Sequence, residues 1–135
     1  MKLGVDTSVL PRLFLKDDDE RLAQARAMIE RIAAADGSLY VPQAVLCELA
    51  WVLSVKAGFG RAEIAQAVRG LVETAIIELE DQDTVCAALE RHQTSGTGFA
   101  DCLIAENALA AGVASFTTFD GALLRADDCL APAEV

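Results

Sequence analysis

Four acidic residues stand where a carboxylate could do chemistry, and Asp6 is the first of them. It follows a short apolar run at residues 3–5 and is followed by Thr7 and Ser8. The run predicts a buried strand, and the two hydroxyl residues are suited to cap a helix. A carboxylate would then lie at the edge where open α/β sheets bind ligands. The alternative is that Asp6 only begins a turn.

Glu48 and Asp101 lie on predicted helices that are otherwise apolar. Glu48 is surrounded by the apolar residues of positions 44–53, and an ionised carboxylate there is costly unless something pairs with it. Asp101 falls in the first turn of its helix, and positions 93–124 contain no Lys or Arg, so neither it nor Glu106 has a basic partner nearby in the sequence. The alternatives are a solvated strip for Glu48 and compensation of the helix dipole for Asp101.

Asp120 is the fourth acid, and its position repeats that of Asp6. It follows Thr117 and Thr118 at the end of the last clear predicted strand, although an Asp before a Gly is also ordinary turn chemistry. We expect the four acids to converge at one edge of the sheet, where their charges would repel one another. Mg²⁺ or Mn²⁺ would relieve that repulsion. Such ions activate water for phosphodiester hydrolysis, so the pattern predicts a metal-dependent nuclease site.

The elements that must position these acids alternate between strands and helices. Strands are predicted at 3–5, 38–41, 75–79 and 113–118, with an edge strand near 129–130. Helices are predicted at 21–35, 42–57, 61–74, 84–93, 99–111 and 122–125, and a first helix after Ser8 carries Val9, Leu13, Phe14 and Leu15. The alternation predicts one three-layer α/β domain over residues 1–135, with a mostly parallel sheet of about four or five strands flanked by helices.

Composition narrows the function further. The net charge of −10 argues against a general nucleic-acid binder and suits either bound cations or a basic partner. No apolar stretch is long enough for a membrane span, and the start does not resemble a signal peptide, so we expect a soluble, cytoplasmic chain. The single His92 is predicted on a polar helix end, which supports neither a zinc site nor Ser-His-Asp catalysis. Three cysteines are expected to be reduced core thiols: Cys47, Cys86 and Cys102.

The segments that contain the four acids also resemble a known family. They are Val5-Asp-Thr-Ser-Val-Leu10, Cys47-Glu-Leu-Ala-Trp-Val-Leu53, Gly98-Phe-Ala-Asp-Cys-Leu-Ile-Ala105 and Thr117-Thr-Phe-Asp120. In order and spacing they resemble the PIN-domain ribonucleases, and more narrowly the VapC toxins of prokaryotic toxin–antitoxin pairs. The resemblance spans nearly the whole chain.

The resemblance implies that Asp6, Glu48, Asp101 and Asp120 form a catalytic set that holds Mg²⁺. It implies supporting polar roles for Thr7 or Ser8 and for Thr118. It also implies cleavage of a structured RNA such as a tRNA or rRNA, a cognate antitoxin, and a toxin homodimer. Because the chain is acidic, we expect the antitoxin to bring a basic segment. The candidates for contacts with RNA phosphates are Arg12, Lys16, Lys56, Arg61 and Arg91.

Two other functions compete with the nuclease. A phosphohydrolase or phosphoacceptor domain on a similar sheet would want a second Asp two residues after Asp6, or an acidic pair before it and a Lys near the last strand. This chain has Ser8 at that position, no acidic pair and no such Lys. A catalytically inactive PIN-like interaction domain is the other alternative, and such a domain would not need four acids in apolar settings.

Overall fold

The computed structural model describes residues 1–135 and contains five strands, five α-helices and three short 3₁₀ helices. The strands are β1 (Lys2–Gly4), β2 (Ser38–Val41), β3 (Ile77–Leu79), β4 (Phe116–Thr117) and β5 (Cys129–Leu130). The α-helices are α1 (Asp19–Ala34), α2 (Gln43–Ala57), α3 (Arg61–Glu73), α4 (Gln82–Ser95) and α5 (Phe99–Ala110). The 3₁₀ helices are η1 (Leu10–Leu13), η2 (Leu123–Arg125) and η3 (Pro132–Glu134).

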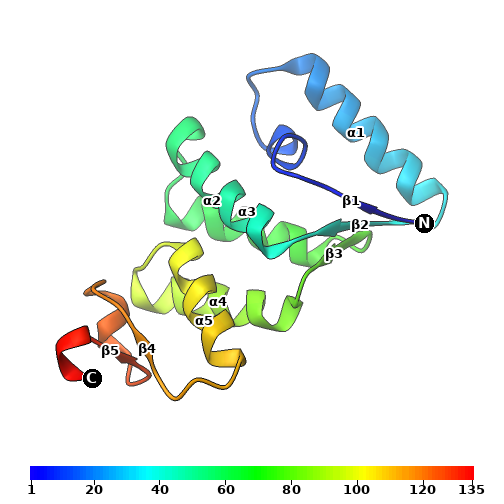
Figure 1. The fold of residues 1–135 in the computed structure, drawn as a ribbon. Coiled ribbons are helices and arrows are strands. Elements are labelled where there is room, and N and C mark those ends of the chain that lie inside the picture. The colour runs from blue at the N-terminus through cyan, green and yellow to red at the C-terminus, as the bar shows by residue number, and fades with distance from the viewer.

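All strand pairs are parallel, as the alternation of strands and helices predicts. The strands form two sheets, however: a three-stranded sheet in the order β1-β2-β3 and a two-stranded sheet of β4 and β5. In Figure 1 the smaller sheet lies beside the C-terminus, at the other end of the molecule from the N-terminus. The predicted α/β class is therefore confirmed, and the five strands are divided between two sheets.

The core lies between the larger sheet and the helices. Leu39 and Val41 of β2 are almost fully buried and belong to one apolar cluster with Leu46 and Leu49 of α2 and Leu103 of α5. Figure 1 shows α1 above the sheet and α4 and α5 below it. A second, smaller cluster joins α5 to the C-terminal sheet through Ala105, Leu123 and Cys129.

Local chemistry explains where the helices begin and end. The carboxylate of Asp18 accepts a hydrogen bond from the backbone N–H of Arg21 and so caps α1. At the start of α2, the N–H of Gln43 donates to Glu80, which lies just beyond β3. Helix α2 ends at Gly58, whose φ of 67° lies in the left-handed region that glycine tolerates best. None of the helices has the length and apolar character that crossing a membrane requires.

Three local expectations are wrong. The first predicted helix is only the four-residue η1, and neither Thr7 nor Ser8 caps it, because Val9 occupies the cap position without a side-chain hydrogen bond. Cys86 is exposed rather than part of the core, although it, Cys47 and Cys102 are free thiols as expected. His92 is 1% exposed and lies inside the protein rather than on a polar helix end.

Candidate functional site

Asp6 lies two residues beyond β1 and is exposed to solvent. The hydroxyl of Ser8 donates to Asp6 Oδ1 over 2.6 Å, and the backbone N–H of Ser8 donates to the same oxygen over 2.9 Å. Both hydrogen bonds hold the pKa of Asp6 below its usual range, and the bond from the Ser8 hydroxyl has the larger effect. Ser8, and not Thr7, is therefore the residue that orients this carboxylate. Asp6 is kept ionised, and its Oδ2 is left without a hydrogen bond from the protein.

Glu48 and Asp101 lie on the neighbouring helices α2 and α5 and flank the half-buried thiol of Cys47. Burial raises the pKa of Cys47, and the negative charges of Asp101 and then Glu48 raise it further. Both acids are exposed, and neither makes a hydrogen bond or an ion pair. Two unpaired carboxylates on adjacent helices thus act electrostatically on one thiol.

Asp120 lies between β4 and η2, in the C-terminal part of the chain. Its Oδ1 accepts hydrogen bonds from the backbone N–H groups of Ala122 at 2.9 Å and Leu123 at 3.2 Å. The hydroxyl oxygen of Thr118 accepts from the backbone N–H of Asp120 at 2.9 Å. Asp120 therefore performs the turn-forming role that the sequence left open. Thr118 supports its backbone, and the second carboxylate oxygen remains available.

A divalent cation needs several oxygen ligands that point at one place. In this structure no three His, Cys, Asp or Glu side chains form a group that could hold a metal ion. Asp6 follows a strand of the larger sheet, whereas Asp120 follows a strand of the smaller one, and these sheets are not hydrogen-bonded to each other. The chemical type of the four side chains suits Mg²⁺, but their arrangement here does not form the ligand set.

Arg91 is not free to contact an RNA phosphate. Its Nε donates to Glu106 over 2.8 Å, and its Nη1 and Nη2 donate to the two oxygens of Asp128 over 3.1 and 2.7 Å. The Arg91 side chain is only 11% exposed. Glu106, which has no basic neighbour in the sequence, therefore obtains its partner from α4. Arg91 ties α5 and the C-terminal strands to that helix.

His92 connects the segment before α5 to the start of α3. Its Nδ1 lies 2.6 Å from the carbonyl oxygen of Thr97, and its Nε2 lies 3.1 Å from that of Arg61. A guanidinium nitrogen of Arg61 donates in turn to the carbonyl oxygen of His92 over 2.8 Å. The ring also meets Phe99, the first residue of α5, edge to face. His92 thus helps to place the helix that carries Asp101, and no Ser or Asp side chain accompanies it.

A cavity between η1 and α1 brings together basic residues that the sequence analysis only partly identified. Its volume is about 470 Å³, and three arginines line it beside Ser8. We call it the arginine cavity, and its main lining residues are Ser8, Arg12, Arg21, Gln24, Met28 and Arg31. Only Arg12 was among the expected phosphate contacts. The spacing of Arg21, Gln24, Met28 and Arg31 along one helix face was the signal that could have revealed the others.

The fold agrees with the result of comparison with known proteins. The PIN domain family matches residues 4–128, and the chain therefore belongs to that family. It is also 25% identical over 119 residues to the VapC ribonuclease of Aquifex aeolicus (strain VF5), a match that covers 88% of this chain and 87% of that protein.

Proposed function

We propose that the chain is an endoribonuclease and acts as the toxin of a toxin–antitoxin pair. The observation that carries the proposal is that the match to the PIN domain family spans residues 4–128 and so includes Asp6, Glu48, Asp101 and Asp120. None of the four carboxylates forms an ion pair with a Lys or Arg side chain, which leaves their charge available to a bound cation. Membership of the PIN family and the similarity to a VapC ribonuclease support the same function. The proposed substrate is a structured RNA such as a tRNA or rRNA.

The proposal includes a requirement for Mg²⁺, with Mn²⁺ as a substitute, held by carboxylates drawn from the four acids. A bound cation of this kind would supply water activation and stabilisation of the leaving oxygen. All four acids have carboxylate oxygens with no partner in the protein: both oxygens of Glu48 and of Asp101, and the Oδ2 of Asp6 and of Asp120. Because the arrangement described above does not gather three ligands, we assign no coordination geometry.

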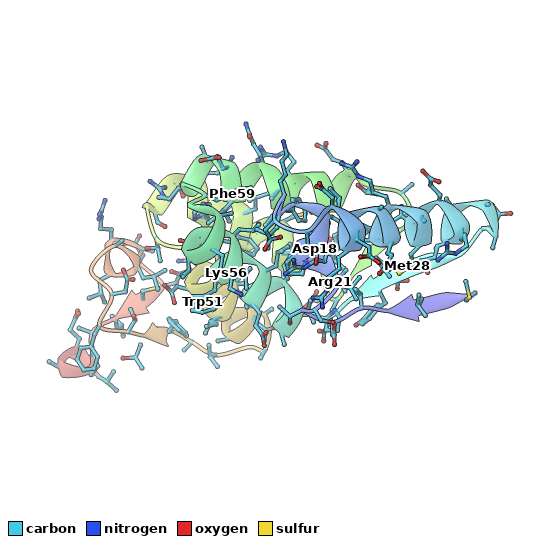
Figure 2. The ribbon with its side chains drawn as sticks, turned by 90° about the horizontal axis from the view of Figure 1, so that it is seen from above. Asp18, Arg21, Met28, Trp51, Lys56 and Phe59 are labelled. Atoms are coloured by element: carbon cyan, nitrogen blue, oxygen red, sulfur yellow. The ribbon has the colours of Figure 1, made fainter.

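The proposal also includes a cognate antitoxin with a basic segment and a toxin homodimer, in the cytoplasm. The charge of −10 supports the first, because opposite charge speeds association. Apolar side chains exposed on the adjacent helices α2 and α5 support a protein interface: Trp51 is 62% exposed, Val55 61% and Ile104 54%. Figure 2 shows Trp51 and Lys56 on α2. Light scattering of the purified chain tests the dimer.

A second candidate is an inactive PIN-like interaction domain. The observation in its favour is the lack of a group of three acidic side chains that could hold a metal ion. Such a domain would bind a partner through the same surfaces and would not hydrolyse RNA under any metal condition.

RNA cleavage by the purified chain, freed of antitoxin, tests both candidates. We expect cleavage with Mg²⁺ or Mn²⁺, loss of cleavage in EDTA, and loss in Asp6→Asn. Asp127→Asn is the matched control, because Asp127 is exposed and has no hydrogen-bond partner. Undiminished cleavage in EDTA would refute the metal requirement. An intact, well-folded chain that never cleaves RNA would favour the interaction domain.

A further inference from the structure

The arginine cavity is a basic site in an acidic protein. The chain has eleven Lys and Arg residues against twenty-one Asp and Glu, yet three arginines and no carboxylate line this cavity. Arg31 forms no ion pair. Its place in the last turn of α1 is by itself explained by the helix dipole. The dipole does not explain why Arg12 and Arg21 line the same cavity.

Two of the three arginines have acidic partners that leave most of their donors free. Arg12 contacts Asp17 through Nη1 at 3.0 Å, and Arg21 lies 3.4 Å from Asp18 through Nε. Neither Asp lines the cavity. A guanidinium carries five N–H donors, so each arginine retains hydrogen-bonding capacity after these contacts.

Arg12 also carries an unsatisfied donor. Its side chain is 18% exposed, and its Nε is buried without any hydrogen-bond partner. A buried donor without an acceptor is unfavourable for the folded protein. A phosphate oxygen in the cavity would bond to the guanidinium groups that line it more strongly than a neutral acceptor would.

The cavity adjoins the candidate active site. Ser8 lines it and also donates to Asp6 over 2.6 Å. From Ser8 the cavity follows one face of α1, and Figure 2 shows Arg21 and Met28 along the same side of that helix. Arg21 and Arg31 are ten residues apart, which is about 15 Å along the helix axis. Such a length exceeds one phosphate group and suits a chain of them.

We propose that the arginine cavity binds backbone phosphates of the RNA chain next to the phosphodiester that lies at Asp6. This inference rests on the proposed function for the identity of its ligand. The site gives an acidic protein a local means to hold a polyanion. Its contacts are to phosphate and therefore position the RNA without reading its sequence.

Binding of a fluorescein-labelled oligouridylate, measured by anisotropy in EDTA, tests the proposal without cleavage. We expect Arg31→Gln to weaken binding about tenfold at low salt. The slope of log K against log salt should become shallower by about 0.7 for one lost phosphate contact. Arg31→Lys should restore much of the affinity. Arg69→Gln is the matched control, because Arg69 also forms no ion pair but lines a separate cavity with Arg61 and His92.

Each result has a defined meaning. Equal losses of RNA affinity in Arg31→Gln and Arg69→Gln would mean that the change in net charge alone weakens binding. That result would overturn the subsite. Unchanged RNA binding in Arg31→Gln, with Arg31-dependent binding of poly-glutamate instead, would assign the cavity to an acidic protein segment. RNA binding that depends on Arg31 in a wild type that never cleaves would retain the subsite and refute the nuclease. RNA cleavage by a wild type whose RNA binding is unchanged in Arg31→Gln would retain the nuclease and refute the subsite.

Discussion

Arg91 and Asp128 form a two-point ion pair that fastens the C-terminal strands to α4. Both oxygens of Asp128 accept from the guanidinium, at 2.7 and 3.1 Å, and the same arginine holds Glu106 of α5 at 2.8 Å. The planar guanidinium matches a carboxylate in this geometry in a way that a lysine cannot. The pair holds the residue directly before β5 against α4.

Asp128→Asn should lower the free energy of unfolding at pH 7 by about 1–2 kcal/mol, between the values for exposed and buried pairs. Arg91 holds the pKa of Asp128 below its usual range. The stabilisation is therefore fully present above the ordinary Asp pKa of about 3.9 and is lost as the pH falls through the lower folded-state value. Urea unfolding from pH 7 into the acid range should show the two curves converging. The control Asp127→Asn should keep almost the full free energy of unfolding of the wild type. A difference between Asp128→Asn and the wild type that stays constant at every pH would contradict this account.

Ser8→Ala should move the acid limb of RNA cleavage to higher pH. The Ser8 hydroxyl makes the largest contribution to the lowered pKa of Asp6. Its removal lets that pKa rise, so Asp6 becomes protonated at a higher pH than in the wild type. Thr7→Ala is the control, since Thr7 makes no side-chain hydrogen bond to Asp6. A pH–rate profile for each variant measures the shift. If the acid limbs of Ser8→Ala and the wild type superimpose, protonation of Asp6 does not limit cleavage.

Asp101→Asn tests whether Asp101 is a metal ligand or an acid that only compensates the dipole of α5. If Asp101 serves only the dipole of α5, the change should cost about 0.3–1 kcal/mol and leave cleavage intact. We expect instead that the metal-free variant melts no lower than the wild type, because removal of one charge relieves repulsion with Glu48. A hundredfold excess of Mg²⁺ over its Kd should raise the free energy of unfolding of the wild type by about 2.7 kcal/mol. The variant should lose most of that gain together with its cleavage, and thermal melts with Mg²⁺ and with EDTA measure both.

Glu80→Ala should destabilise the junction between β3 and α2. Glu80 accepts the N–H of Gln43 over 2.8 Å and so serves as the cap that Pro42 cannot supply. Loss of a helix cap costs about 0.5–2 kcal/mol, and we expect the lower half of that range because Glu80 is exposed. Urea unfolding measures the loss, and Glu78→Ala is the control, since Glu78 pairs only with the exposed Lys2.

Local pattern was sufficient to predict most elements. Apolar runs and turn residues gave the strands and the α-helices with small errors at their ends, because these signals lie within a few residues of one another. The exception was the segment after Ser8, where the apolar residues predicted a longer helix than the four-residue η1.

The sequence by itself determined the α/β class, the parallel pairing of the strands and the positions of the four acids along the chain, because periodicity and residue type are local properties of the chain. Only the tertiary structure decided which side chains meet. It buried His92, exposed Cys86, and gave Glu106 a partner fifteen residues away on another helix. It also paired β4 with β5 rather than with the larger sheet, so that Asp6 and Asp120 follow strands of different sheets. Such meetings depend on how whole helices and strands pack, and the spacing of residues along one element does not encode them.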